Sequence, residues 1–423
     1  MPGRAYSIGI AWFAPDPVVD LEIVGLLKGL AERGFVKGEN LSVLAAHAQG
    51  EVANLAAIVR DFDARGLGAL VPMTTPALVG ALSGAKRTPV VFSGVYDPLA
   101  AGAGKSFAEH LPFVTGVSSF PDIARTVETI RRLVPNARSV GTLYNPSEPN
   151  SSKVVKVSRD LFRAASLRLE ETAIASTAEA VPAVDVLVGR GVDALWVTGD
   201  NTALQAFPAI AGAATRARIP LVNNHVEFLR NGGLASVGTN FFESGYAAAD
   251  PVARVLNGAS PGSIPIRNVS VPELGLSLGV ARALGLSFPP DLLAQARAFP
   301  GLGAWLGRPA RLALAADDSA SAAAAREALV KGLARALLEE GSDFVLAGWR
   351  DGTGEPEPDL LFDARAAAGG PLSAAGPTVP SLPVGPGEES ASRAAVEAVR
   401  LLVDGRGSGS ARSPARSPAT ASP

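Results

Sequence analysis

The sequence predicts an α/β fold of two similar lobes, each a parallel sheet flanked by helices, followed by a partial C-terminal α/β repeat. Three observations predict it. Short apolar runs alternate with stretches of helical periodicity through residues 1–300, which is typical of a parallel sheet wrapped by helices. The alternation restarts near Thr115, so the chain has material for two lobes. A segment beyond residue 309 then repeats the start of the chain.

The first lobe is expected over residues 6–117 and 241–268. Leu21, Val24 and Leu27 have the spacing of one helix face, and Gly34 ends that helix. The strands of this lobe are predicted at 8–13, 41–45, 69–73 and 90–93, and its helices at 20–33, 55–64 and 76–85.

The second lobe is expected over residues 118–240 and 270–298. Its strands are predicted at 139–144, 168–173, 194–198 and 220–223, and its helices at 123–133, 151–166, 180–190 and 202–218. The strand 235–239, the helix 243–256 and the extended run 264–269 are too little for a third lobe. They indicate that the chain crosses between the lobes near residues 118, 240 and 270. Such a hinge places a cleft between the carboxyl ends of the two sheets.

Residues 1–300 are therefore expected to form one two-lobed binding domain, and residues 301–309 a linker. The run Leu26–Ala31 matches Leu329–Ala334, and the flanking predicted strands follow in the same order, so residues 310–405 are expected to be an incomplete second copy of that domain. The alternative is that any βαβ unit in an alanine-rich protein resembles any other. Because nothing after Asp363 is expected to complete a lobe, this copy should not bind ligand by itself. Residues 406–423, rich in Ser and Pro, are expected to be disordered.

Composition excludes several classes of function. The net charge of -2 argues against a nucleic-acid surface, which needs a concentrated basic face. The absence of cysteine excludes disulfides and thiolate chemistry. His47, His110 and His225 have no metal-site spacing, so no metal site is expected and each is interpreted as an ordinary loop or surface residue.

The chain has no apolar run of the roughly 18 residues that a membrane span needs. Residues 1–4 lead directly into the first predicted strand without an apolar signal region, and no cysteine is present for a lipid anchor. Two interpretations stay open: the protein remains inside the cell, or its export segment lies outside this sequence.

Polar and aromatic side chains follow the predicted strands, where the cleft would be. Thr75, directly before a proline, begins a helix whose free N–H groups suit a carboxylate. Asn150 or Ser151 is expected to cap another helix in the same way, and Asp200 ends a strand where it could pair with an ammonium group. Each residue taken alone is also a common turn or cap residue. The candidate ligand-binding residues are Phe13, Gln49, Thr74, Thr75, Tyr96, Asp97, Tyr144, Asn150, Ser151, Asp200 and Asn240. Together they favour a zwitterion such as an amino acid.

These motifs are specific enough to indicate a family. The motifs that carry the resemblance include Ala48–Glu51, Thr75–Ala77, Val114–Ser118, Glu148–Ser151 and Asp200–Thr202. Residues 6 to about 298 resemble the ABC transporter substrate-binding proteins associated with tryptophan and tyrosine uptake.

That resemblance implies a type I periplasmic-binding-protein-like clamshell, which holds its ligand between the lobes outside the cytoplasm and delivers it to an ABC permease. It further implies that Thr75 and Ser151 hold the ligand carboxylate and that Asp200 holds the amine. The sequence departs from the family at Asp16, where a histidine is usual, and at Glu51, where aspartate is commoner.

The expected function is non-enzymatic binding of an amino acid, aromatic ones favoured, by closure of the lobes of a monomer, with no cofactor. The alternative is a ligand-sensing module that uses the same clamshell for signalling. An enzyme is disfavoured because the GxSxG motif is absent and because Leu99 stands where a phosphate loop ending in Gly104-Lys105-Ser106 needs its first glycine.

Overall fold

The computed structural model describes residues 5–300 and parts of the C-terminal region. In that region it describes residues 310–315, 324, 328–329, 333, 336–337, 344–349, 360–363, 381–383 and 388–403. Packing divides the chain into two compact units, Met1–Gly275 and Leu276–Pro423. The predicted linker 301–309 and the predicted tail 406–423 lie outside the described residues.

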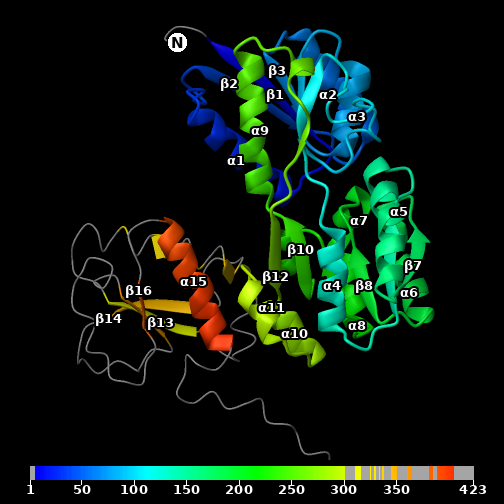
Figure 1. The fold of residues 1–423 in the computed structure, drawn as a ribbon, viewed down its shortest axis with the longest axis vertical. Helices are drawn as coiled ribbons and strands as arrows, with labels where there is room; N and C mark the ends of the chain where they lie inside the picture. Colours follow the sequence, from blue (N-terminus) through cyan, green and yellow to red (C-terminus); the bar gives the residue numbers. More distant parts are fainter. Residues whose placement is uncertain are drawn as a thin grey trace, which may run out of the picture. The chain divides into compact units, whose positions relative to one another are not determined.

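The first unit contains two six-stranded sheets (Figure 1). The first sheet has the strand order β11-β5-β4-β3-β1-β2, and its strand pairs are parallel. Its strands are β1 (Tyr6–Trp12), β2 (Leu41–His47), β3 (Ala69–Pro72), β4 (Val90–Val95), β5 (Val114–Ser118) and β11 (Arg267–Asn268). Its helices are α1 (Pro17–Ala31), α2 (Val52–Ala64), α3 (Thr75–Gly84) and α9 (Phe241–Leu256), followed by the short 3-10 turn η3 (Pro261–Ser263). We call this sheet and its helices lobe 1.

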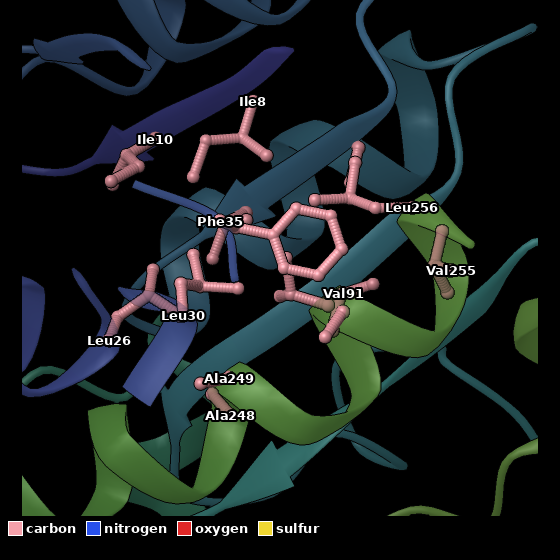
Figure 2. Packing of buried hydrophobic residues seen from close by; sticks show 14 of the residues in the cluster. Ile8, Ile10, Leu26, Leu30, Phe35, Val91, Ala248, Ala249, Val255 and Leu256 are labelled. Atoms are coloured by element: carbon pink, nitrogen blue, oxygen red, sulfur yellow. The ribbon is translucent and has the colours of Figure 1, made fainter. Parts of the chain in front are cut away.

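Lobe 1 has a hydrophobic core on each face of its sheet. Successive side chains of a strand point to opposite faces, so Val91 belongs to one core and its neighbour Phe92 to the other. Figure 2 shows the first core, in which Leu26 and Leu30 of α1 meet residues of α9 and the sheet. Helices α2 and α3 cover the opposite face. This packing fixes α1 against β4, which matters for the site described below.

The second sheet has the order β12-β10-β9-β8-β6-β7, and its pairs from β7 to β10 are parallel. Its strands are β6 (Ser139–Tyr144), β7 (Arg168–Ala173), β8 (Ala194–Val197), β9 (Leu221–Asn223), β10 (Ala235–Thr239) and β12 (Pro272–Leu276). Its helices are α4 (Ile123–Leu133), α5 (Pro149–Ala164), α6 (Ala180–Gly189), α7 (Asn201–Gln205) and α8 (Phe207–Arg216), with the 3-10 helices η1 (Thr177–Glu179) and η2 (Val226–Asn231). We call this part lobe 2. The predicted fold class, two parallel sheets flanked by helices, is confirmed.

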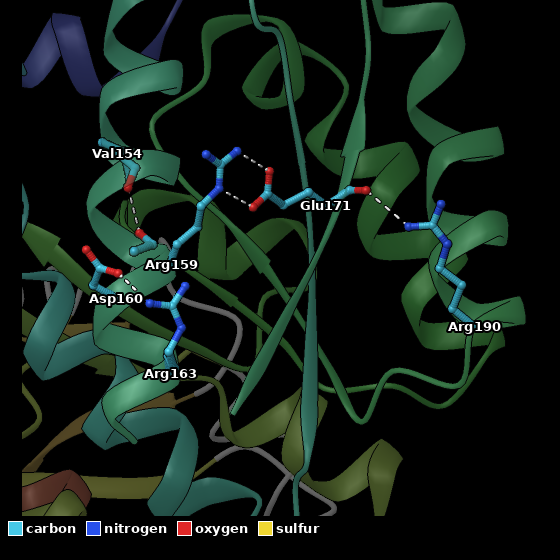
Figure 3. A network of polar contacts seen from close by, with 7 residues as sticks. Val154, Arg159, Asp160, Arg163, Glu171 and Arg190 are labelled. Carbon is cyan, nitrogen blue, oxygen red and sulfur yellow. Dashed lines mark hydrogen bonds and ion pairs between the residues drawn. The ribbon is translucent and has the colours of Figure 1, made fainter. Parts of the chain in front are cut away.

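A polar network joins α5, β7 and the end of α6 in lobe 2 (Figure 3). The guanidinium of Arg159 donates from Nε and Nη2 to the two carboxylate oxygens of Glu171, at 2.7 Å each. Arg190 donates to the backbone carbonyl of Glu171 at 3.1 Å. Because the Arg159 side chain is half exposed, water screens this pair and it stabilises the lobe only modestly.

The chain passes between the lobes three times. It leaves the first sheet after Ser118, returns to it after Thr239 and leaves it again after Asn268. In an α/β sheet of this kind, ligands bind beyond the carboxyl ends of the strands. The loops after β1, β3, β4, β6, β8 and β9 are therefore the place to look for a site.

The second unit contains α10 (Leu278–Leu284), α11 (Pro290–Gln295) and a four-stranded parallel sheet. The sheet order is β14-β13-β15-β16, and α15 (Glu388–Val403) follows it in the chain. Its strands are β13 (Ala310–Ala315), β14 (Phe344–Trp349), β15 (Leu360–Asp363) and β16 (Ser381–Pro383). Arg400 of α15 donates to the carbonyls of Leu293 and Ala296 at the end of α11.

This order repeats that of β2-β1-β3-β4 in lobe 1. The registers also correspond, since Tyr6 pairs with Leu41 at the start of β1 and Ala310 pairs with Phe344 at the start of β13. We propose on this ground that the segment is an incomplete copy of a lobe. Beyond Asp363 the structure describes one more short strand, β16, and the expectation that nothing there completes a lobe stays a prediction. The predicted domain boundary near residue 300 stays a prediction, and the packing divides the chain earlier, after Gly275.

Candidate ligand-binding site

Two adjoining cavities lie between lobe 1 and lobe 2. The smaller, of about 30 Å³, is polar and has walls from both lobes. The larger, of about 410 Å³, opens to the surface and falls in the size range of small-molecule sites. The two cavities share Asp16, Thr74, Asn201 and Leu204, so they form one continuous cleft.

Asp16 lines both cavities from the loop after β1. It is the N-cap of α1, and its Oδ1 accepts a hydrogen bond from the Val18 N–H at 2.9 Å. Burial raises the pKa of the Asp16 carboxyl to about 6, against the opposing effect of the Val18 hydrogen bond, and the charge of Asp20 adds to the rise. Asp16 thus presents its second carboxylate oxygen to the cleft. This oxygen accepts no hydrogen bond from the described residues.

Glu22 lies deeper, on the second turn of α1, and is 1% exposed. Its carboxyl accepts a hydrogen bond from the hydroxyl of Ser93 on β4 at 2.5 Å. Gly94 has φ +64° and no side chain, and a Cβ there would lie 3.0 Å from Oε1 of Glu22, so glycine makes room for the carboxyl. Burial raises the pKa of Glu22 to about 8, the Ser93 hydrogen bond opposes this rise, and the charge of Asp16 adds to it.

The N-terminus of α3 faces the cleft with a strained backbone. Thr74, its N-cap, has φ +81° and ψ 153°, a conformation that favours glycine and costs other residues about 1–3 kcal/mol. The Thr74 hydroxyl is buried and makes no hydrogen bond among the described residues. Thr75 follows as a buried residue of the first turn and lines the smaller cavity. Strain and an unused donor at a helix N-terminus point to a ligand anion at this position.

Tyr96 and His225 connect the lobes. The Tyr96 hydroxyl and His225 Nε2 lie 3.0 Å apart in a hydrogen bond, and the imidazole stacks on the ring of Phe241 at 5.1 Å. Burial lowers the pKa of His225 to about 3, so the ring is neutral, and burial raises the pKa of Tyr96. His225 Nδ1 is buried and has no hydrogen-bond partner among the described residues.

Asn150, in the first turn of α5, lines the smaller cavity from lobe 2. Its Nδ2 donates to the carbonyl of Gly199 at 2.8 Å, which orients the amide. Its Oδ1 is buried and accepts no hydrogen bond among the described residues. The N-cap of α5 is Glu148, so the expectation that Asn150 or Ser151 caps this helix is wrong.

Asp200 is 0% exposed and lines neither cavity of the cleft. Its carboxylate accepts from the N–H of Asn145 at 2.5 Å, the hydroxyl of Ser151 at 2.7 Å and the N–H of Ala203 at 2.7 Å. Burial raises the pKa of Asp200 to about 6, and the nearby charge of Glu148 adds to the rise. These contacts use both oxygens of the carboxylate and the hydroxyl of Ser151. Asp200 and Ser151 thus hydrogen-bond within lobe 2 and line neither cavity of the cleft, and the ligand-binding roles expected for them stay predictions.

A third cavity, of about 510 Å³, lies beside Tyr96 at the lobe interface. Asp97 lines it and forms an ion pair with Lys153 of lobe 2 at 3.5 Å. This pair and the Tyr96–His225 hydrogen bond both join the lobes.

The expected site residues therefore divide into two groups. Those that line the cleft or the neighbouring cavity are Phe13, Gln49, Thr74, Thr75, Tyr96, Asp97 and Asn150. Those that line none of these three cavities are Tyr144, Ser151, Asp200 and Asn240, the last of which caps α9 by accepting from the Glu243 N–H.

The sequence missed several residues of the cleft: Asp16, Glu22, Asn201, Leu204, His225, Phe228 and Phe241. Asp16 carried a signal, since it stands directly after the first strand in place of the usual family histidine. Glu22 and His225 carried none, because a glutamate in a helix and a histidine in a loop are ordinary features until packing buries them.

Two properties concern the described residues as a whole. None of their helices has the length and apolarity to cross a bilayer. No three of their His, Asp or Glu side chains gather as metal ligands.

Comparison with known proteins supports the two-lobed fold and relates the chain to one protein family. A family model described as ABC transporter substrate binding protein matches residues 7–299. A tyrosine-binding protein of Clostridioides difficile is 28% identical over 280 residues, which are 66% of this chain and 81% of that protein. The structure of an ABC domain in complex with L-Trp from Streptococcus pneumoniae is 30% identical, with a TM-score of 0.67, and covers 70% of this chain and 100% of that chain.

A ligand-free, open substrate-binding protein with adhesive properties from Clostridium difficile is 27% identical, with a TM-score of 0.54. That match covers 67% of this chain and 96% of the other.

Proposed function

Since the chain belongs to the ABC transporter substrate-binding protein family, we propose that its cleft binds an amino acid, aromatic ones favoured, for delivery to an ABC permease. The family resemblance drawn from the sequence is thereby confirmed. The proposal includes that the protein binds without catalysis, as a monomer, in an extracytoplasmic compartment. Its support is that one relative is a tyrosine-binding protein and another was solved with L-Trp. No feature of the described residues favours the sensing alternative.

The observation that carries the proposal is the separation of acceptors from donors in the cleft. Asp16 of lobe 1 and the unused Oδ1 of Asn150 in lobe 2 are acceptors beside the smaller cavity. An ammonium group needs three acceptors, and a carboxylate with an amide oxygen supplies them. We therefore assign the ligand amine to these residues in place of Asp200.

The ligand carboxylate fits the N-terminus of α3. There the Thr74 and Thr75 hydroxyls and the free N–H groups of the first turn are donors, and the helix dipole favours negative charge. No lysine or arginine lines either cavity of the cleft in the described lobes. The carboxylate is thus held by dipoles rather than by a cation.

The aromatic side chain fits the larger cavity. Phe13 of lobe 1 and Phe228 of lobe 2 stand on its walls, together with Leu204 and Pro208. The amides of Gln49 and Asn201 also line this cavity and offer partners to a phenolic hydroxyl or an indole N–H. An aromatic ring with one polar atom therefore matches the wall better than an aliphatic chain.

Closure of the lobes is the proposed mechanism of binding. The Tyr96–His225 and Asp97–Lys153 contacts form only when the lobes meet. A ligand that contacts both lobes adds its interactions to the closed state alone, and only such differential contacts shift the equilibrium. The higher TM-score with the tryptophan-bound structure than with the open one supports a closed arrangement here.

Isothermal titration calorimetry of the full chain with L-tryptophan, L-tyrosine and N-acetyl-L-tryptophan tests the proposal. The two free amino acids should bind, and the N-acetyl derivative, which lacks the ammonium group, should not. Asp16→Asn keeps the helix cap but removes the charge. A hydrogen bond to a charged group contributes about 1.5–3 kcal/mol, so this variant should bind the amino acids about 10- to 150-fold more weakly.

The matched control is Asp185→Asn, the same change at an exposed carboxylate of α6 that lines neither cavity of the cleft, and this variant should bind like the wild type. Absence of heat with every amino acid would overturn the proposed function. Equal affinities for the Asp16→Asn and Asp185→Asn variants would overturn the assignment of the amine.

A further inference from the structure

We propose that Asp16 and Glu22 form one acidic subsite that holds the ammonium group of the ligand, and that binding of this group releases a proton from the pair to the solvent. The inference rests on the proposed function, because it assumes a ligand that carries an amine. It goes further by naming a second carboxyl group, Glu22, and by coupling ligand binding to the protonation of the protein.

The geometry supplies the first argument. Both carboxyl groups line the smaller cavity, although only Asp16 reaches the larger one. Among the described residues each accepts a single hydrogen bond, from the Val18 N–H and from the Ser93 hydroxyl respectively. Two carboxylates offer about eight lone-pair sites, and those two bonds occupy two of them, so the pair has acceptor capacity that the described residues do not use. By contrast, the Asp200 carboxylate accepts three hydrogen bonds from donors of lobe 2, and that of Glu148 accepts four from Asn201 and Thr202.

Among the described residues no cation compensates the two carboxyl groups. The titratable groups that face the pair there are Asp20 on α1, Tyr96 after β4, and His225 and Glu227 around η2. All of these are acidic or neutral. The basic side chains of α1 lie elsewhere, with Lys28 over the ring of Phe242 and Arg33 over the ring of Tyr246.

Like charges in such a cavity cannot both ionise cheaply, and the empty cleft therefore keeps a proton on the pair. Burial and the neighbouring charge raise the pKa of Glu22 to about 8 and that of Asp16 to about 6. At pH 7 the empty pair thus holds about one proton, mostly on Glu22. An ammonium group placed against both carboxyls favours their charged forms and lowers both pKa values, so the proton leaves.

The sign of the pH dependence follows from these values. The affinity should rise with pH between about 6 and 8, because the empty protein still holds a proton on Glu22 there and the complex has released it. The affinity should change by up to about tenfold per pH unit when one whole proton is released. As the pH rises through the pKa of Glu22, about 8, the empty pair loses this proton and the pH dependence of the affinity should flatten.

Calorimetry in buffers of different ionisation enthalpy measures the proton directly. L-Tryptophan and L-tyrosine are titrated into the full wild-type chain at pH 7 in phosphate and in Tris. The difference in heat should correspond to about 0.5–1 proton released for each ligand bound. Glu22→Gln keeps an acceptor for the Ser93 hydroxyl but cannot ionise, and should bind with a release near zero and a flat pH profile from 6.5 to 8.

The control Asp185→Asn should release as many protons as the wild type. Binding with equal heats in both buffers would overturn this inference and leave the proposed function intact. Binding of neither amino acid at any pH would overturn both. The proton release measured for the wild type in the two buffers tests the inference even if Glu22→Gln fails to fold.

Discussion

Helix α1, which carries both carboxyl groups of the cleft, is held against α9 by glycine. Gly245 of α9 faces the backbone of Glu22, and Gly25 of α1 faces the backbone of Phe242. A Cβ added at Gly245 would lie 2.8 Å from the carbonyl carbon of Glu22 and 3.0 Å from the amide nitrogen of Leu26. Because both neighbours are backbone atoms, neither can move without moving the helix. We therefore expect Gly245→Ala to destabilise lobe 1.

The expected loss of stability in Gly245→Ala follows from these distances. Heavy atoms normally approach to about 3.5–4.0 Å, so the two helices would have to separate by roughly 0.5–1 Å. Such overpacking typically destabilises the folded protein by about 1–3 kcal/mol. The higher helix propensity of alanine over glycine stabilises it by about 1 kcal/mol. The matched control is Gly212→Ala in α8, where the new Cβ would meet only the flexible Arg216 side chain at 3.5 Å. That variant gains the propensity without the clash.

The assay is thermal unfolding of both variants and the wild type, followed by circular dichroism. Gly212→Ala should melt at or slightly above the wild type. Gly245→Ala should melt below the control by roughly 4–8 °C, since about 1 kcal/mol corresponds to about 2–4 °C in proteins of this size. Equal melting temperatures for the two variants would refute the reasoning, because they would show that α1 and α9 are not in backbone contact.

Two other predictions concern lobe 2. Asp200→Ala removes the acceptor of three buried hydrogen bonds and should destabilise the protein by about 2–4 kcal/mol in urea unfolding. The variant loses no direct contact with the ligand, so its affinity for L-tryptophan should stay within about threefold of the wild type. That is less than the tenfold change in affinity that about 1.4 kcal/mol produces. A hundredfold loss of affinity with little change in stability would restore the ligand-binding role that the sequence indicated. Arg159→Ala breaks the half-exposed pair with Glu171 and should destabilise by no more than about 1 kcal/mol, with a smaller effect in 0.5 M salt, and a larger effect that salt does not change would contradict a screened pair.

The fold was largely accessible from the sequence because each signal for it is local. The apolar run around Ile8 and Ile10 and the helical spacing that follows it are properties of neighbouring residues, and the structure has β1 and α1 there. Where the local signal was weak, prediction was less exact. The extended run expected at 264–269 is a strand only at Arg267–Asn268, and β12 follows it within a few residues, at Pro272–Leu276. Such short edge strands depend on pairing with a distant neighbour rather than on their own composition.

The site was accessible only in part. Thr74, Thr75 and Asn150 were found because polar residues after strands collect at one edge of a parallel sheet. Asp200 obeys the same rule and still faces inward, because Ser151 and two backbone N–H groups satisfy its carboxylate. The position of a residue in the sequence can place it near a cleft. It does not show which hydrogen-bond donors contact that residue in the folded protein.

The sequence by itself determined the two-lobed α/β architecture, the family and the edge of each sheet beside which the cleft lies. Those properties follow from periodicity and from motifs whose residues are neighbours in the chain. Only the tertiary structure decided that Glu22 and His225 belong to the cleft, since helix packing turns Glu22 inward and contact with Tyr96 and Phe241 of lobe 1 buries His225. The chemistry of this site depends on burial and on charges brought together from distant segments, and these exist only after the chain has folded.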